Sequence, residues 1–255
     1  MNAGTIALAS APIAAGLAGL TYATVAPTCQ FWGPVISRGK SGSNRFALTF
    51  DDGPTPGTTD RVLDALAAAQ TKATFFVVGA NADAHPDLLR RIRDEGHLIA
   101  NHTFRHSHYG VMRTFPYWFR EIGQTEDVIK MQTRLRTALF RPPMGVKTWH
   151  SARAARELGH NVVTWSRRAM DGLPTTSKRI LDRLGGATDG EILLLHDGVE
   201  PNAYHRDRSA TIEAIVPLIE RLRSRGLSPV RLDELLGING YQEKSPAATG
   251  SPATR

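Results

Sequence analysis

From Phe46 onward the chain alternates short apolar runs with amphipathic stretches of helical length. We expect the apolar runs to form strands, and they cover residues 46–50, 73–78, 97–100, 139–141, 161–165, 191–195 and 228–231. We expect the intervening stretches to form helices, at residues 58–70, 84–95, 115–138, 149–158, 177–184 and 209–225. Repeated strand–helix units give parallel strands, because each helix returns the chain to the same edge of the sheet. About seven such units predict an α/β fold, a distorted (β/α) barrel that is complete or incomplete, with chemistry at the C-terminal ends of its strands.

The first charged side chain is Arg38, so residues 1–37 form an uncharged, largely apolar N-terminal segment. Within it, residues 4–27 are mostly Ala, Leu, Ile, Val, Gly and Thr and are long enough to cross a bilayer as a helix. We therefore expect an apolar N-terminal helix that acts as a membrane anchor, with a buried or docked helix as the alternative. The positive residues from Arg38 to Arg45 follow the segment, and by the positive-inside rule they would keep the next domain in the cytoplasm.

The remaining chain divides by composition into three parts. Residues 38–45 have the composition of a linker, residues 46–237 carry the strand–helix units, and residues 238–255 form a tail rich in small and polar residues that we expect to be disordered. The net charge is +7, but the basic residues are scattered along the chain, so we expect no nucleic-acid partner. Cys29 is the single cysteine, which excludes an internal disulfide. We expect a monomer.

Two adjacent carboxylates, Asp51 and Asp52, end the first predicted strand and are followed by the turn Gly53-Pro54. Neighbouring side chains on a strand face opposite ways, but a turn at the strand end lets both reach one pocket. Carboxylates that share a pocket repel each other, so a cation must offset them or one must stay protonated. A capping Asp beside a solvated Asp is the alternative.

His102 and His106 follow the third predicted strand and stand four residues apart. One helical turn or a tight loop can aim both imidazoles at a single ion. Together with a carboxylate they would supply two nitrogens and one oxygen and leave a fourth position open, which is typical of catalytic zinc. Two histidines at this spacing also occur by chance, and we expect the neighbouring His97 and His108 at the surface.

Three further motifs end predicted strands. Arg141 begins Arg-Pro-Pro-Met-Gly, and its guanidinium can hold a carboxylate with two parallel hydrogen bonds. Asp171 follows the run that ends at Trp165, and His196 follows Ile-Leu-Leu-Leu. Taken singly, these residues are also explained as a rigid turn, a solvated carboxylate and a structural histidine. Their common position at strand ends favours one shared site.

In this order the motifs resemble the polysaccharide deacetylases of carbohydrate esterase family 4, the nodulation-type chitooligosaccharide deacetylase homology domain. The resemblance covers about residues 45–236. It implies a distorted barrel and a divalent metal, usually zinc, with cobalt or nickel as alternatives. The metal ligands that it implies are Asp52, His102 and His106.

The resemblance also implies catalytic roles. Asp51 resembles the general base held by Arg141, and His196 resembles the general acid oriented by Asp171. The backbone N–H of Met144 would be the protein's part of the oxyanion site. The chain departs from the family pattern at two positions, with Arg168 and Gly172 where an Asp and a Trp are usual, and this puts the contacts of that wall with substrate in doubt.

The function implied by the resemblance is hydrolysis of N-acetyl groups on an amino-sugar polymer or oligosaccharide, such as a cell-wall or chitin-like glycan. The enzyme would act on carbon–nitrogen bonds other than peptide bonds, at the bacterial cell envelope. Two alternatives stay open: an O-deacetylase that acts on an acetylated polysaccharide, and a non-catalytic homologue that binds wall glycan.

Overall fold

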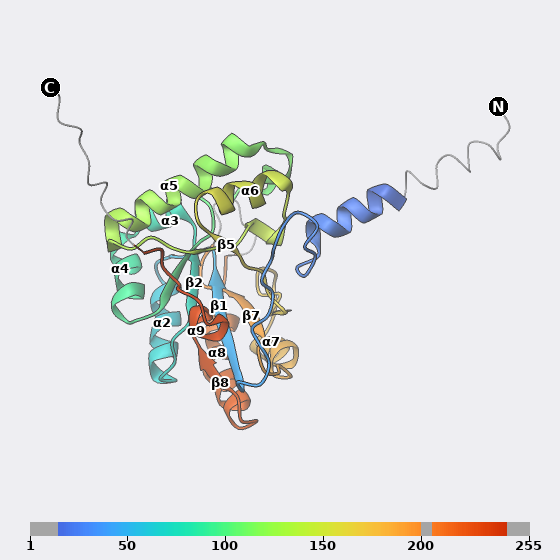
Figure 1. Cartoon of the computed structure of the whole chain (residues 1–255). Helices are drawn as coiled ribbons and strands as arrows, with labels where there is room; N and C mark the ends of the chain where they lie inside the picture. Colours follow the sequence, from blue (N-terminus) through green and yellow to red (C-terminus); the bar gives the residue numbers. More distant parts are fainter. Residues whose placement is uncertain (1–14, 200–205, 244–255) are drawn as a thin grey trace.

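A curled sheet of parallel strands forms the centre of the molecule (Figure 1). The computed structural model describes residues 15–199 and 206–243. The strands are β1 (Arg45–Asp51), β2 (Thr74–Val77), β3 (Leu98–Asn101), β4 (Leu139–Phe140), β5 (Asn161–Val162), β6 (Arg167–Arg168), β7 (Ile192–His196) and β8 (Ser228–Val230). Along the sheet they follow the order β5–β4–β3–β2–β1–β7–β6, and β8 pairs with β1 beside this path. The seven strands of the path form an open half-barrel, so the incomplete form of the predicted barrel is the one observed.

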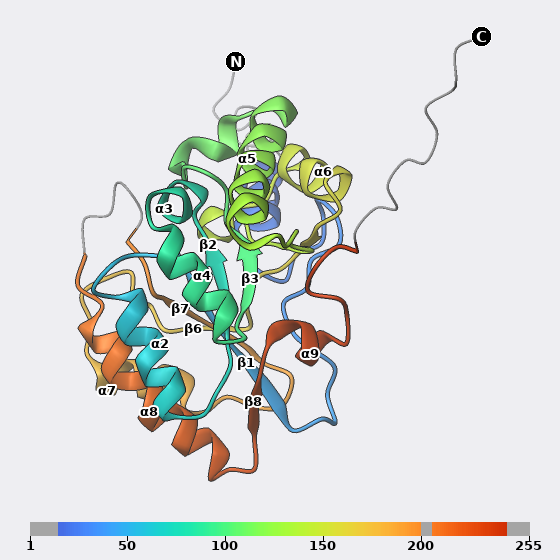
Figure 2. The ribbon, with the colours of Figure 1, turned by 90° about the vertical axis from the view of Figure 1, so that its left-hand side faces the viewer.

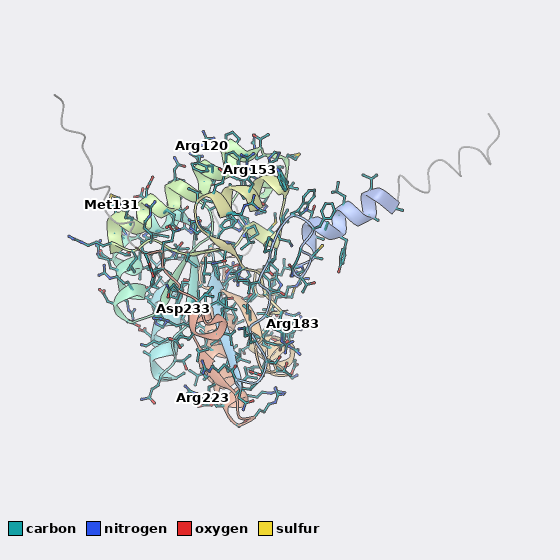
Figure 3. All side chains as sticks on the ribbon, in the orientation of Figure 1. Arg120, Met131, Arg153, Arg183, Arg223 and Asp233 are labelled. Carbon is teal, nitrogen blue, oxygen red and sulfur yellow. The ribbon has the colours of Figure 1, made fainter. Side chains whose placement is uncertain are left out.

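Helices cover the outer face of the curled sheet (Figures 1 and 2). They are α2 (Thr59–Ala68), α3 (Gly79–Ala84), α4 (Pro86–Asp94), α5 (Phe115–Thr133), α6 (Trp149–Glu157), α7 (Ser177–Leu184) and α8 (Ser209–Arg223). Helix α9 (Leu232–Leu236) packs with Ala47 on the opposite face, and the chain also forms short 3₁₀ turns η1 (His108–Met112) and η2 (Pro143–Gly145). Helices α2, α7 and α8 lie side by side, and α5 contacts α3, α4 and α6. The arginines labelled in Figure 3 project from α5, α6, α7 and α8, on different sides of the domain.

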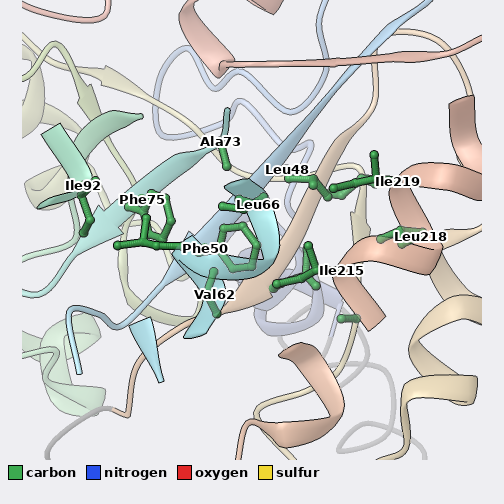
Figure 4. Packing of buried hydrophobic residues seen from close by; sticks show 14 of the residues in the cluster. Leu48, Phe50, Val62, Leu66, Ala73, Phe75, Ile92, Ile215, Leu218 and Ile219 are labelled. Carbon is green, nitrogen blue, oxygen red and sulfur yellow. The ribbon is translucent and has the colours of Figure 1, made fainter. Parts of the chain in front are cut away.

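The alternation of side chains along β1 separates the core from the site. Phe46, Leu48 and Phe50 belong to the apolar cluster between the sheet and the outer helices, where Phe50 stacks on Phe75 with ring centres 5.2 Å apart (Figure 4). Ala47 belongs to a second cluster, which α9 helps to fill. Because strand side chains alternate, Asp51 lies on the same side of the strand as Ala47, inside the curl.

Several predicted boundaries need correction. The helix expected at residues 84–95 is α4, which begins at Pro86, and the short helix α3 before it was not predicted. The helix expected at 115–138 ends at Thr133, where Arg134 takes a left-handed conformation with φ 62°. Strand β5 is shorter than expected, and the short elements β6 and α9 were not predicted.

The N-terminal segment is held against the domain after its helical part. Residues 15–25 are helical, and no helix among the described residues is both long and apolar enough to span a membrane. The anchor expected at residues 4–27 begins in residues 1–14, which lie outside the described part of the chain. Residues 24–38, which we name the strap, run back along the domain. The N–H and the Nζ of Lys147 donate to the strap carbonyl oxygens of Thr24 and Ala26, at 2.9 and 2.7 Å.

The predicted linker and the beginning of the predicted tail are both packed. In the segment 38–45, the N–H groups of Gly42, Ser43 and Arg45 donate to the Asp189 carboxylate. At the other end, Tyr241 contacts both apolar clusters, and its hydroxyl accepts the Ile99 N–H at 3.1 Å. Residues 238–243 therefore pack on the domain and do not form a disordered tail, because Ile238, Tyr241 and Gln242 all contact it, while residues 244–255 lie outside the described residues.

Candidate active site

The C-terminal ends of four strands meet inside the curl and bring the predicted site residues together. Register places Asp51 of β1 opposite His196 of β7. On the other side of β1, β2 pairs with β3, and the chain leaves β3 towards His102 and His106. Arg141 directly follows β4 and lies next to the end of β3, where its backbone N–H donates to the carbonyl oxygen of Asn101 at 3.0 Å.

Asp52, His102 and His106 form a buried cluster with the composition of a metal site. One ligand atom from each lies within 4.8 Å of the others. Asp52 Oδ1 is 3.5 Å from His102 Nε2 and 3.4 Å from His106 Nε2. The same Oδ1 is buried without a hydrogen-bond partner among the described residues. A buried orphan oxygen is costly unless something satisfies it, so this donor set fits a divalent cation.

Left-handed backbone conformations occur at Asp52 and His106, and at Thr103 next to His102. Asp52 has φ 75°, directly after β1 ends. Thr103 and His106 have φ 68° and 50°, and the Thr103 hydroxyl accepts the His106 N–H at 3.2 Å. Side chains other than glycine rarely adopt such angles, and they persist where the surroundings enforce them. Met144 and Met170, in the loops that complete the site, share this feature at φ 55° and 60°.

His102 is oriented by a hydrogen bond to the backbone. Its Nδ1 lies 2.7 Å from the carbonyl oxygen of Arg141. Because a carbonyl only accepts, Nδ1 carries the proton, and the lone pair of Nε2 faces Asp52. A metal-ligating histidine is commonly fixed in this way.

Asp51 lies beside the cluster and is held by a buried arginine. Arg141 Nη1 donates to Asp51 Oδ1 at 2.6 Å and to the Thr49 hydroxyl at 2.9 Å, and Nη2 donates to the Thr164 carbonyl at 2.9 Å. The guanidinium is completely buried and lies 3.9 Å from the centre of the Phe76 ring. The other Asp51 oxygen, Oδ2, is 3.6 Å from His102 Nε2, next to the place where an ion would bind.

His196 and Asp171 lie at the end of β7, next to the end of β1. His196 Nδ1 is 2.7 Å from Asp171 Oδ1, while Asp171 Oδ2 accepts the His196 N–H at 2.9 Å and the Thr211 hydroxyl at 2.7 Å. Burial disfavours the charged imidazole, but the negative charge of Asp171 and its hydrogen bond outweigh this and raise the pKa of His196 to about 9. The His196 side chain remains 21% exposed, so it can reach a bound substrate.

Asp197 and two glycines lock the β1 and β7 loops together. Asp197 Oδ2 accepts the Thr59 hydroxyl at 2.6 Å, and burial raises the pKa of this carboxyl to about 7. A Cβ on Gly53 would lie 2.1 Å from that Oδ2, and one on Gly198 would lie 2.2 Å from the carbonyl carbon of Asp52. Neither position has room for a side chain, because the two loops are in direct contact.

Gly198→Ala should therefore displace Asp52. The clash is with backbone, so it should lower the free energy of unfolding by about 1–3 kcal/mol and reduce both metal content and activity. Thermal melting and metal analysis of the purified variant measure this. Gly123→Ala is the matched control, because a Cβ there meets nothing within 4 Å. A wild-type melting temperature and metal content in Gly198→Ala would contradict the close packing of the two loops around Asp52.

Met144 and Trp165 form the wall near the strap. The side chain of Met144 is 49% exposed. We find no acceptor for the Met144 N–H among the backbone hydrogen bonds of the described residues. Trp165 packs beneath the turn, since a Cβ on Gly145 would lie 2.5 Å from its ring. Gly172 leaves space beside His196, with the His196 Cε1 at 3.9 Å from an added Cβ.

The side chains predicted for the site are thus near one another at the strand ends, and they are Asp51, Asp52, His102, His106, Arg141, Asp171 and His196. Sequence reasoning missed their supporting residues, which are Thr49, Thr59, Thr164, Asp197 and Thr211. Asp197 follows His196 directly and could have been found there, whereas Thr211 sits on α8 without a sequence signal. His97, expected at the surface, is buried, and its Nδ1 accepts the Ala73 N–H at 3.1 Å. His108 is exposed, as expected.

Comparison with known proteins gives a consistent result. The sequence profile of the family described as polysaccharide deacetylase matches residues 38–163. A chitooligosaccharide deacetylase of Rhizobium leguminosarum bv. trifolii is 35% identical over 202 residues, which are 74% of this chain and 90% of that protein. A peptidoglycan-N-acetylglucosamine deacetylase of Listeria monocytogenes is 32% identical over 205 residues, 80% of this chain. The chain spans 41% of the length of that relative.

Solved structures of proteins with similar names superpose on this chain. A peptidoglycan N-acetylglucosamine deacetylase in complex with an N-oxidanyl-benzamide superposes with a TM-score of 0.76 at 27% identity, covering 82% of this chain and 95% of that one. A family 4 carbohydrate esterase of Streptomyces lividans in complex with acetate superposes with a TM-score of 0.67 at 28% identity, covering 73% and 92%. The predicted resemblance is confirmed, and the chain belongs to the polysaccharide deacetylase family, carbohydrate esterase family 4.

Proposed function

We propose that the protein is a metal-dependent N-deacetylase of an amino-sugar polymer. The observation that carries the proposal is that Asp51 and His196 lie at neighbouring strand ends, with Asp51 directly beside the Asp52–His102–His106 cluster. A base and an acid within one site are what hydrolysis of an amide requires. The names of the relatives, peptidoglycan and chitooligosaccharide deacetylases, support this class of substrate.

Different residues of the chain would carry out the separate steps of the reaction. When bound, a divalent ion supplies Lewis acidity to the acetyl carbonyl and to water. Asp51, held by Arg141, takes a proton from the attacking water as the new carbon–oxygen bond forms. The Met144 N–H stabilises the negative charge that develops on the carbonyl oxygen.

His196 completes the reaction. As an imidazolium it gives its proton to the sugar nitrogen while the carbon–nitrogen bond breaks, which leaves acetate and a free amine. Asp171 and Thr211 fix its ring and favour its charged form. An amide needs this proton more than an ester does, because an amine anion is a very poor leaving group. The complete His196–Asp171 pair therefore favours N-deacetylation over O-deacetylation.

Release of acetate from a panel of glycans tests the proposed function. The panel contains N-acetylglucosamine oligosaccharides, peptidoglycan and acetylated xylan, each assayed with and without added zinc. We expect release from the amino-sugar substrates that depends on the metal. Release from xylan alone would favour the O-deacetylase, and binding without any release would favour a non-catalytic homologue.

The cell envelope is the proposed place of action, which the peptidoglycan deacetylases among the relatives support. The membrane anchor within residues 4–27 stays a prediction.

The purified protein should bind about one divalent ion per chain. Binding to the folded state alone should raise its stability by about 2.7 kcal/mol at an ion concentration 100 times the Kd. We expect this thermal shift to vanish in His102→Ala and to persist in His150→Ala, a histidine of α6 outside the cluster. Zinc, cobalt and nickel are the ions to compare by calorimetry. An unchanged stoichiometry in His102→Ala would contradict the metal site.

A further inference from the structure

We propose that a pocket between the strap and the wall of the active site binds a carboxylate-bearing sugar unit of the substrate. The proposal rests on the proposed function and refines it to an acidic glycan. The pocket has a volume of about 590 Å³, in the range of small-molecule sites. Strap residues 25–28 line one side, and Met144, Trp165 and Arg168 line the other.

The strap is fixed as a wall of this pocket. Thr164 Oγ1 donates to the Pro27 carbonyl at 2.8 Å, and Lys147 Nζ donates to the Ala26 carbonyl at 2.7 Å. These bonds engage two strap carbonyls with the domain, which leaves fewer acceptors to repel an anion. The small and apolar strap residues suit the apolar face of a sugar ring, and the buried Trp165 supports the wall beneath them.

Arg168 supplies the charge. It is exposed, and among the described residues it has no ion pair and no side-chain hydrogen bond. Its neighbour Arg167 differs, because its Nε donates to Glu191 at 2.6 Å. No acidic residue lines the pocket, so nothing there competes for the Arg168 guanidinium. A guanidinium matches a carboxylate with two parallel hydrogen bonds.

The pocket borders the catalytic groove. Met144 lines the pocket and follows Arg141, the residue that holds Asp51, by three positions. Arg168 pairs with Leu194 on β7, the strand that ends at His196. A sugar seated in the pocket would therefore neighbour the unit that loses its acetyl group. An acidic residue at the Arg168 position would repel such a sugar.

Two substrates that differ only in the charge of the carboxylate test the proposed role of Arg168. One is an alternating oligosaccharide of N-acetylglucosamine and N-acetylmuramic acid, with a carboxylate on every second unit, and the other is its methyl ester. We expect wild-type protein to prefer the acid by about tenfold in kcat/KM, through KM, and in affinity by calorimetry. In Arg168→Gln the ratio should fall to about one, while Arg61→Gln, the same change on an exposed face of α2, should keep it.

The two measurements separate this proposal from the proposed function. An acid preference in binding without any acetate release would leave the pocket assignment standing and reject the deacetylase. Acetate release without a preference for the acid, or a preference that survives in Arg168→Gln, would overturn the pocket assignment. Thr28→Trp, which fills the pocket from the strap, should weaken binding of both substrates, and unchanged affinity would also overturn it.

Discussion

Asp51→Asn should lower kcat on an N-acetylated glycan by about 10²- to 10⁴-fold, because an amide cannot take the proton of the attacking water. The Asp52–His102–His106 cluster is left unchanged by this substitution, so metal content should stay close to one ion per chain. Activity and metal are measured on the same preparation. Asp127→Asn, on the exposed face of α5, is the matched control and should behave as wild type.

The structure shows that Asp51→Asn should also destabilise the folded protein, which the sequence did not indicate. Arg141 is completely buried, and Asp51 is its anionic partner. Removing one member of a buried ion pair typically costs about 3–5 kcal/mol, so Asp51→Asn should also melt at a lower temperature. Asp51→Glu keeps the charge while displacing the carboxylate, and it should fold and lose activity. Near-wild-type kcat in folded, metal-loaded Asp51→Asn would rule out the general base.

His196→Ala should lower kcat by about 10²- to 10⁴-fold on an N-acetyl substrate and by much less on an activated ester. The leaving group of the ester needs no proton, so only the amide requires an acid. Parallel assays on both substrates, with His150→Ala as the control, measure the difference. An equal loss on amide and ester would leave His196 with a positioning role only.

The pH dependence of the rate on the amide tests the same acid role of His196. An acid must be protonated to act, so the rate on the amide should be present below the pKa of His196 and fall as pH rises through it. Asp171 raises that pKa to about 9, and a bound cation near Asp52 would act in the opposite direction. Asp171→Asn should therefore move the alkaline fall towards lower pH. A fall at the same pH in Asp171→Asn would show that another group controls it.

The central strands β1, β2, β3, β4 and β7 were predictable from sequence because they are buried on both faces and read as apolar runs. Residues 191–195 illustrate this, since β7 is apolar until it reaches His196. β6 was missed because it consists of two arginines, which have no apolar signal. The folded state of residues 238–243 also escaped prediction, because Tyr241 docks a segment whose composition is otherwise that of a loop.

The site was predictable to the extent that its residues follow strands. Parallel strands bring their C-terminal ends to one edge, so Asp51, His102, Arg141 and His196 could be placed together from their order alone. Thr211 could not, because its contact with Asp171 depends on how α8 docks on the sheet. The position of the strap beside Met144 also depends on tertiary packing, since nothing in its own sequence pairs it with that turn.

The position of β1 in the sheet has a consequence for synthesis of the chain. β1 pairs with β2 on one side and with β7 on the other, although β7 lies far along the sequence. During translation the metal-ligating segment leaves the ribosome long before Ile192 does, and until then β1 keeps an unpaired edge. Unpaired edges recruit strands of other chains. Nascent chains and fragments that end before Ile192 should therefore be prone to aggregate, even though they already contain Asp52, His102 and His106.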